Sequence, residues 1–143
     1  MTAAVVVDAS VAIKWFVAEA DSGLADRLLE QKVALHAPLL LMSEFANGLW
    51  KNFRRELIDS AQAEAALRAI PRTIAHWHAT ESLLDAALAL SFRLDHPVYD
   101  FLYVALAERN GLRCITADLR FIRKIRSTEH ATRVIALTDW RPE

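Results

Sequence analysis

Short apolar runs alternate with longer segments of helical periodicity along this chain. The first run, Val5–Val7, has three β-branched residues in succession, which favours a buried strand. Comparable runs predict further strands at residues 33–37, 113–116 and 132–137, and a minor strand at Thr73–Ile74. Strands that alternate with helices in this order imply a parallel sheet that is covered on both faces.

The segments between the runs also carry helix start and stop signals. In the segment 39–55, large apolar residues recur at three- and four-residue steps. Ser10 can cap a short helix that opens at Val11, and Pro71 is expected to end the helix before it. The other helices are expected at residues 21–31, 61–70, 80–94, 99–109 and 118–126. We therefore predict one three-layer α/β domain over residues 1–143, with helices flanking a central parallel sheet of four to five strands.

Composition and charge narrow the class of protein. The 143 residues are 54% hydrophobic with only 3 Gly and 4 Pro, which favours a helix-rich globule over disorder. Because 17 basic and 18 acidic residues leave a net charge of −1, nucleic-acid binding would need local basic patches. The single cysteine, Cys114, excludes an internal disulfide and is expected to be a small buried residue. With no signal-peptide pattern and no membrane-spanning run, we expect a cytoplasmic protein.

Four acidic residues occupy positions from which they could share a site. Asp8 and Asp118 each follow a predicted strand, and Asp100 opens the helix that leads into the second of those strands. Glu44 lies on the 39–55 helix, opposite its apolar stripe. Taken singly, each has an ordinary role as a helix cap or a solvated side chain.

Gathered in one crevice, the four carboxylates would repel one another. One pair about 4 Å apart costs about 4 kcal/mol at an effective dielectric constant of about 20. A divalent cation offsets such repulsion, and hard oxygen ligands favour Mg²⁺ or Mn²⁺, which can polarise a phosphoryl oxygen. Ser10 and Thr116 add hydroxyls that could hold a water or a phosphate oxygen. The spacing leaves two interpretations open, separate capping roles or a metal-dependent phosphoester site.

The segments that contain these acids resemble a known family. They are Val-Val-Asp-Ala-Ser-Val-Ala-Ile-Lys-Trp-Phe (6–16), Ser-Glu-Phe-Ala-Asn-Gly-Leu (43–49), Val-Tyr-Asp-Phe-Leu-Tyr-Val-Ala-Leu-Ala-Glu (98–108) and Thr-Ala-Asp-Leu-Arg-Phe (116–121). In order and interval they are similar to the PIN domain, and more closely to VapC toxins, the ribonuclease half of VapBC toxin–antitoxin pairs. The resemblance runs from about Val5 to about Asp139, although residues 58–94 match only in helical character.

The resemblance implies a Rossmann-like PIN domain that acts as a Mg²⁺- or Mn²⁺-dependent endoribonuclease. It also implies inhibition by a cognate VapB-type antitoxin and assembly as a homodimer. The acidic quartet of the family, which would hold the metal and carry catalysis, matches Asp8, Glu44, Asp100 and Asp118. Ser10 and Thr116 match the hydroxyls beside the first acid and before the last, and Asn47 matches a frequent polar residue one turn beyond the glutamate.

Basic residues are candidates for RNA contacts. Two clusters stand out, Lys51, Arg54 and Arg55, and Arg120, Arg123, Lys124 and Arg126. A solvated helix face explains them as well as RNA binding does. If the second cluster, beside Asp118, holds RNA phosphates, Arg120→Ala with Lys124→Ala should weaken RNA binding and reduce its salt dependence. Lys14 could also face the crevice.

Two further groups of residues have ordinary explanations in the sequence. His76 and His78 have a spacing that suits two metal ligands on a strand, but no third ligand is evident. Trp50 and Phe53 could line a dimer or antitoxin surface, since aromatic residues are enriched in interfaces.

Two rival functions compete with the ribonuclease. A phosphatase that uses Asp8 as a nucleophile is disfavoured, because that class usually has a second acid two residues on, where Ser10 stands. A catalytically silent PIN-fold protein-binding module is the alternative, and a metal-binding titration would separate it from the nuclease.

Overall fold

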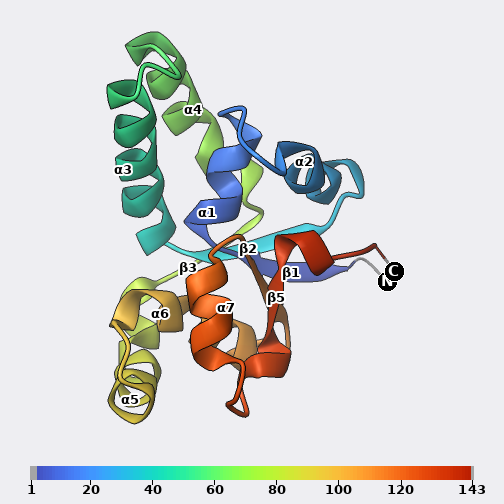
Figure 1. Ribbon diagram of the computed structural model, residues 1–143, viewed down its shortest axis with the longest axis vertical. Helices are drawn as coiled ribbons and strands as arrows, with labels where there is room; N and C mark the ends of the chain where they lie inside the picture. The colour runs from blue at the N-terminus through green and yellow to red at the C-terminus, as the bar shows by residue number, and fades with distance from the viewer. Residues whose placement is uncertain (1–2, 143) are drawn as a thin grey trace.

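One parallel sheet of five strands runs through the computed structural model, which describes residues 3–142 (Figure 1). The strands lie in the order β3-β2-β1-β4-β5, and every neighbouring pair is parallel. They are β1 (Ala4–Val7), β2 (Ala34–Pro38), β3 (His76–His78), β4 (Arg113–Thr116) and β5 (Val134–Ala136). The predicted three-layer α/β fold is confirmed.

β1 is the central strand, and its side chains are apolar on both faces. Val5, Val6 and Val7 are at most 7% exposed, as expected for a parallel strand that is covered on both sides. Val6 is in register with His36 of β2 and with Cys114 of β4. Cys114 is buried and free, as the sequence predicts.

Helices cover both faces of this sheet. They are α1 (Ala9–Ala12), α2 (Ser22–Glu30), α3 (Leu40–Arg54), α4 (Ser60–Thr73), α5 (Leu84–Leu94), α6 (Val98–Arg109) and α7 (Leu119–Ile125). Short 3₁₀ segments are η1 (Ile13–Trp15), η2 (Thr80–Leu83), η3 (Ala131–Arg133) and η4 (Leu137–Asp139). None of these described helices is long and apolar enough to span a membrane.

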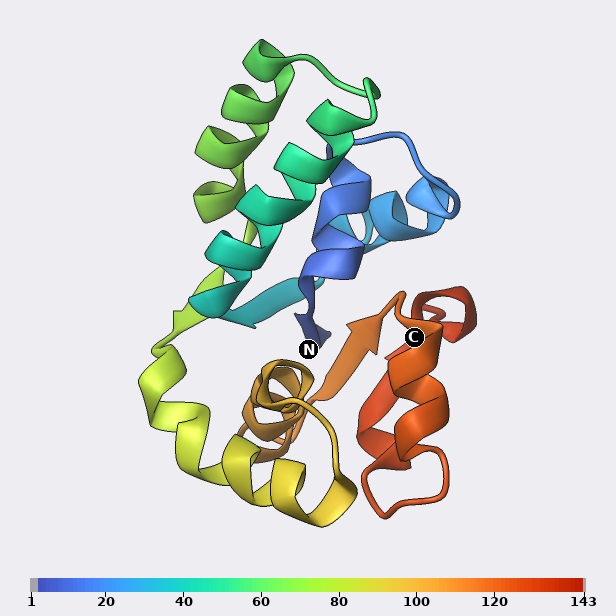
Figure 2. The ribbon, with the colours of Figure 1, turned by 60° about the vertical axis from the view of Figure 1, so that its left-hand side comes forward.

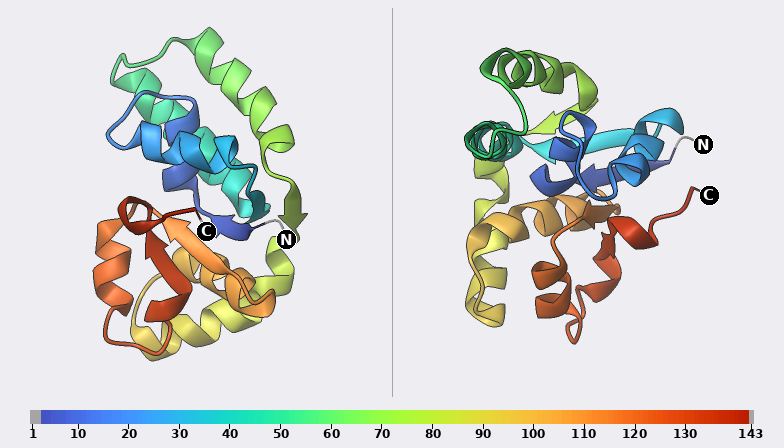
Figure 3. Two further views of the ribbon diagram at one scale, coloured as in Figure 1. Left: turned by 90° about the vertical axis from the view of Figure 1, so that its right-hand side faces the viewer. Right: turned by 45° about the horizontal axis from the view of Figure 1, so that its top comes forward.

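The helices divide into two layers. α1 to α4 lie on one side of the sheet and α5 to α7 on the other (Figures 1 and 2), and Figure 3 shows the same division from two further directions. α6 is the central helix of its layer, since it contacts β1, β2 and β4. Its residues from Phe101 to Ala107 are all buried, which explains why it is apolar around most of its circumference.

Two boundaries in the middle of the chain differ from those expected. Asp59 caps α4 through a reciprocal capping box with Gln62, but Pro71 does not end this helix, which continues to Thr73. A proline in the last turn removes one helical hydrogen bond without preventing the turn. The minor strand is therefore not Thr73–Ile74 but β3, whose residues pair with β2.

The strand order creates an opening at the carboxyl ends of β1 and β4. The chain adds β2 and β3 on one side of β1 and later adds β4 and β5 on the other side. Such a reversal leaves a crevice above the adjacent strand ends, where open α/β sheets bind ligands. Asp8 follows β1 directly and Asp118 lies two residues beyond β4, so both reach this crevice as predicted.

Candidate active site

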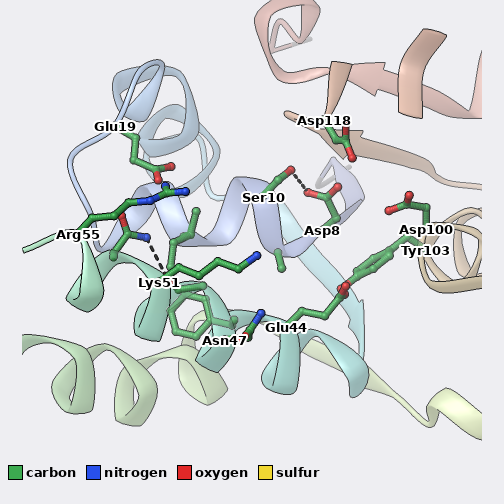
Figure 4. Close-up of a pocket in the computed structure, with 15 residues that line it drawn as sticks. Asp8, Ser10, Glu19, Glu44, Asn47, Lys51, Arg55, Asp100, Tyr103 and Asp118 are labelled. Atoms are coloured by element: carbon green, nitrogen blue, oxygen red, sulfur yellow. Dashed lines mark hydrogen bonds between the residues drawn. The ribbon is translucent and has the colours of Figure 1, made fainter. Parts of the chain in front are cut away.

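The four predicted acids line one cavity of about 480 Å³ at this opening (Figure 4). Asp8 comes from the end of β1, Glu44 from α3, Asp100 from the first turn of α6, and Asp118 from the residue before α7. Ser10 and Asn47 also line the cavity. Segments that lie far apart in the sequence therefore bring these acidic residues to one place.

Asp8 is the most buried of the four acids, with 7% of its surface exposed. It is also the N-cap of α1, where its Oδ1 accepts a hydrogen bond of 3.2 Å from the amide of Val11. The expectation that Ser10 caps this helix is therefore wrong. The carboxylate precedes the helix by one residue and reaches the free amide first, while Ser10 lies inside the first turn.

Ser10 and Thr116 instead hold Asp8 and join the ends of β1 and β4. The hydroxyl of Ser10 donates to Asp8 Oδ1 at 2.5 Å, and the hydroxyl of Thr116 donates to Asp8 Oδ2. Ser10 Oγ accepts a bond of 2.9 Å from the amide of Ala117, and Thr116 Oγ1 accepts one of 3.0 Å from the amide of Asp118. Both hydroxyls therefore fix the geometry at the strand ends as well as the carboxylate.

Asp118 has the capping role that its position after a strand allows. Its Oδ1 accepts hydrogen bonds from the amides of Arg120 and Phe121 at 3.0 and 3.2 Å. Because the same residue lines the cavity, its capping role and a ligand role are compatible rather than alternative.

Glu44 is half-buried and is held by a residue that sequence reasoning missed. The hydroxyl of Tyr103 donates to Glu44 Oε1 at 2.5 Å, and Tyr103 is 2% exposed. A signal was available, since Tyr103 lies three residues after Asp100 and so on the same face of α6. The structure therefore places Glu44 in the cavity rather than on a fully solvated face.

Asp100 also has a partner that the sequence did not indicate. His96 Nε2 lies 2.8 Å from Asp100 Oδ2, and the imidazole packs against the rings of Phe101 and Phe121. His96 lies just before Pro97, which is the N-cap of α6, and four residues before Asp100. This interval brings the imidazole to the carboxylate because the turn before α6 leads directly into the helix.

Burial makes ionisation costly at the centre of the cavity. The pKa of Asp8 is raised to about 6, chiefly by burial and to a smaller extent by the negative charge of Asp100, although the hydrogen bonds from Ser10, Thr116 and the Val11 amide oppose this rise. The pKa of Glu44 is also raised, chiefly by burial. The pKa of Tyr103 lies well above its usual range, because the ring is buried beside Glu44, so the phenol stays a hydrogen-bond donor.

The oxygen donors of this cavity fit a hard divalent cation, although they do not yet converge. Within residues 3–142, no three His, Cys, Asp or Glu side chains are already arranged around a point where a metal ion could lie. Each carboxylate is instead hydrogen-bonded to a protein group of its own. Mg²⁺ keeps several waters and takes one or two carboxylates directly, so it does not require a closed cage of protein ligands. A cation would also relieve the repulsion that raises the pKa of Asp8.

The basic candidates are divided between two places. Lys51 and Arg55 line the cavity, at the end away from Asp100 and Asp118 (Figure 4). Lys14 donates to the carbonyl of Ala20 at 2.7 Å and pairs with Glu19 at 3.4 Å. The exposed side chains of Arg120 and Lys124 lie on α7, outside the cavity lining, as do the other α7 cations.

The histidine pair on β3 has a neighbour that the sequence did not indicate. His36 on β2 lies in register with His76, and its ring stacks on that of His76 with centroids 4.4 Å apart. His36 Nδ1 lies 2.9 Å from His78 Nε2. The three imidazoles share one face of the sheet edge, away from the acidic cavity. Burial, together with the positive charges of neighbouring groups, lowers the pKa values of His36 and His78.

Comparisons with known proteins agree with this geometry. The sequence profile of the PIN domain matches residues 5–126. The ribonuclease VapC3 of Pyrobaculum aerophilum is 36% identical over 121 residues, which cover 83% of this chain and 92% of that protein.

Solved structures share the fold at lower identity. PAE2754 from Pyrobaculum aerophilum superimposes with a TM-score of 0.69 at 23% identity, over 96% of this chain and 85% of that chain. A chain of a toxin–antitoxin complex from Klebsiella pneumoniae superimposes with a TM-score of 0.66 at 16% identity, over 93% of this chain and 97% of that chain. At these identities the likeness concerns the fold alone.

Proposed function

Because this chain belongs to the PIN domain family and, within it, to the VapC ribonucleases, we propose that it is the endoribonuclease toxin of a toxin–antitoxin pair. In this proposal it hydrolyses RNA phosphodiester bonds with Mg²⁺ or Mn²⁺, in the cytoplasm, and residues 1–143 form a single PIN-like domain. The observation that carries the proposal is the cavity at the strand ends of β1 and β4, which four carboxylates line.

We assign the metal to the acids of this cavity. Asp8, Asp100 and Asp118 would hold the ion, with Glu44 beside it as a direct or water-mediated ligand. When bound, the ion would supply charge for the phosphoryl oxygens of the RNA and lower the pKa of a water. Ser10 and Thr116 would keep Asp8 oriented and hold a water or a phosphate oxygen.

The protein's own part in hydrolysis is to position and to accept a proton. The attacking water adds to phosphorus, one P–O ester bond breaks, and the leaving ribose oxygen takes up a proton from solvent. Glu44 Oε1 accepts the Tyr103 hydrogen bond, so we assign the proton of the water to Glu44 Oε2. The raised pKa of Glu44 suits this role, since a base is more effective when its pKa approaches the working pH.

The test is cleavage of a mixed cellular RNA pool by purified protein with Mg²⁺, with Mn²⁺ and with a chelator. Asp8→Asn and Asp100→Asn should abolish discrete, metal-dependent fragments, whereas Asp85→Asn, at an exposed position on α5, should not. Equal cleavage patterns of wild type and both cavity variants would mean that the acids only cap helices or lie in solvent. The catalytically silent binding module would then be the better account.

An antitoxin partner is supported by an apolar groove next to the cavity. The groove lies between α3 and α4 and has a volume of about 250 Å³. Trp50, Phe53 and Leu67 line it, and they are 52%, 46% and 38% exposed. Because α3 lines both the groove and the cavity, an antitoxin segment seated in the groove lies one helix width from the acids.

A homodimer is supported by a second apolar surface, on α5. Leu84, Leu88 and Phe92 recur at four-residue steps and are 43%, 46% and 78% exposed. A single helix face of this kind can pack against its own copy around a two-fold axis. Sedimentation of wild type and Phe92→Ala tests this: a dimer that dissociates in the variant supports the assignment, and a monomeric wild type contradicts it.

A further inference from the structure

The cavity has a second half that the acids do not explain. Successive turns of α3 carry cavity-lining residues along one helix face, from Glu44 through Asn47 and Lys51 to Arg55 just beyond the helix end. At about 1.5 Å per residue, Lys51 lies about 10 Å and Arg55 about 16 Å along the axis from Glu44. Figure 4 shows this arrangement, with Glu44, Asp100 and Asp118 toward one end, Asn47 in the middle, and Lys51 and Arg55 at the other end, where Glu19 also lines the cavity.

The cations in and around this half differ in what they already bind. Lys14 is engaged by Glu19 and by the carbonyl of Ala20, and the guanidinium of Arg54 lies 5.2 Å from the Trp50 ring centroid, outside the cavity. Within residues 3–142, neither Lys51 nor Arg55 forms an ion pair or a side-chain hydrogen bond. Glu19, the one carboxylate at this end of the cavity among the described residues, is paired with Lys14, so the charges of Lys51 and Arg55 remain without an ion-pair partner.

The cavity lining near Lys51 and Arg55 also contains a buried polar group without a hydrogen-bond partner in the part of the chain that the structure describes. Asn52 is 4% exposed, and its Nδ2 donates to the carbonyl of Gly48 at 2.9 Å. Its Oδ1 has no hydrogen-bond partner among the described residues, although the residue lines the cavity. Buried acceptors are normally paired, so this oxygen is free to accept a hydrogen bond from a donor that enters the cavity.

We propose that the cationic half of the cavity is a nucleotide subsite for single-stranded RNA, in which Lys51 and Arg55 bind the phosphates adjoining the scissile one. The amide of Asn47, between the two ends, contacts the ribose or base in between, since it offers both donors and an acceptor. The RNA strand therefore runs along α3 and not across α7. This inference rests on the proposed ribonuclease function and names how the substrate is held.

The size of the cavity agrees with a single strand. A volume of about 480 Å³ is in the range of pockets that enclose one small ligand, which a nucleotide fills and a duplex does not enter. A single strand also lets each phosphate be met separately as the chain passes the helix turns.

The test compares two double variants that each remove two positive charges from an exposed helix surface. Lys51→Ala with Arg55→Ala changes the proposed subsite, and Arg120→Ala with Lys124→Ala changes the cluster on α7. Both are made in an Asp8→Asn background, so that a labelled single-stranded RNA oligonucleotide is bound without cleavage. Dissociation constants are measured over a range of NaCl at fixed Mg²⁺.

The α3 variant should bind at least tenfold more weakly at low salt. Its slope of log affinity against log salt should fall by about 1.4, since each phosphate contact on a single strand contributes about 0.7. Arg54→Ala, the neighbouring cation on the Trp50 ring, should change neither value, and equal thermal unfolding would show that the variants are folded.

The outcomes separate this inference from the proposed function. A slope that falls in the α7 variant and stays unchanged in the α3 variant overturns the subsite but leaves the ribonuclease intact. Failure of the background protein itself to bind RNA, together with no cleavage by wild type, overturns the proposed function.

Discussion

Asp8 carries a conflict between stability and function at the scale of a single residue. A carboxylate that is 7% exposed has to be desolvated, and burial accordingly raises its pKa from 3.8 to about 6. Two hydroxyls and one amide donate to it, yet they do not fully offset the cost of burying the charge. Such a group is retained where the charge itself is needed, which is typical of a ligand for a cation.

Asp8→Asn should therefore stabilise the metal-free protein while it abolishes cleavage. The folded-state pKa lies above the unfolded value, so the folded protein binds the proton more tightly, and the wild type loses stability as pH rises from about 4 to about 6. Above that window the substitution should add up to about 3 kcal/mol to the free energy of unfolding. Urea unfolding of both proteins in chelator at pH 4 and pH 8 checks this.

The difference between the two proteins should nearly vanish at pH 4. A variant that is less stable than wild type at pH 8 would mean that the hydrogen bonds of the carboxylate outweigh its desolvation.

Tyr103 acts on Glu44 without lying near the surface. Its phenol is buried, remains protonated, and reaches from α6 to a carboxylate on α3. Partners of this kind orient a ligand and set its basicity.

Tyr103→Phe should raise the Mg²⁺ or Mn²⁺ concentration needed for half-maximal cleavage by about 10-fold or more, because the oriented donor to Glu44 is lost. Metal titration of the cleavage rate measures this effect. Tyr99→Phe is the matched control, since the chain's other tyrosine is 56% exposed. Equal metal requirements in the two variants would leave Tyr103 with a packing role alone.

At this scale the sequence predicted the acids but not their partners. Asp8 and Asp118 could be predicted because a residue that follows a strand has a known place on the sheet. Tyr103 was missed although it is in phase with Asp100, because its role depends on how α3 and α6, which lie on opposite sides of the sheet, approach each other at the strand ends. The role of His96 depends on the turn that leads into α6. The assignment of Ser10 as a cap was wrong for a related reason: a carboxylate one residue before the helix competes for the same amides.

Among the elements, the β2–β3 edge of the sheet is sensitive to protons. His36 and His78 form an N–H···N hydrogen bond across the two strands, and His76 stacks on the same ring. Their pKa values are lowered, chiefly by burial, and the positive charges of the neighbouring histidines and Arg109 add to this effect.

The free energy of unfolding should therefore fall as pH decreases below about 6.5. A folded-state pKa below the unfolded value means that the unfolded chain binds more protons, so stability is full above pH 6.5 and is lost as protons bind. Urea unfolding between pH 5 and pH 8 should show a shallower loss for His36→Gln than for wild type. His76→Gln should have a smaller effect in the same direction, and identical slopes in all three proteins would contradict the assignment.

The predicted elements were most accurate where periodicity and end signals agree. The β1 run and the 39–55 helix correspond closely to β1 and α3. The predictions around Pro71, for the end of the helix and for the minor strand, were wrong because helix ends and edge strands depend on tertiary pairing. β3 exists because β2 offers it a partner, and three residues with two histidines carry little strand preference of their own.

Over the whole molecule, α3 separates two surfaces of opposite character. One face lines the charged cavity from Glu44 to Arg55, and the other, with α4, forms the apolar groove. The sequence indicated residues of both faces, but it did not decide whether Trp50 and Phe53 contact a second copy of the chain or an antitoxin. The structure adds a second exposed apolar stripe, on α5, so one surface is available for each of the two proposed partners.

Trp50→Ala should then uncouple inhibition from catalysis. Its indole lines the groove and is 52% exposed, so truncation removes a large apolar contact without opening the core. Loss of such an aromatic anchor costs about 2 kcal/mol or more, or about 30-fold in affinity for the proposed antitoxin. Titration of that antitoxin against each variant measures the affinity, and RNA cleavage without antitoxin should be unchanged. Phe92→Ala on α5 is the matched control. If it weakened antitoxin binding and Trp50→Ala did not, the assignment of the two surfaces would be reversed, with the antitoxin on α5 and the dimer contact in the groove.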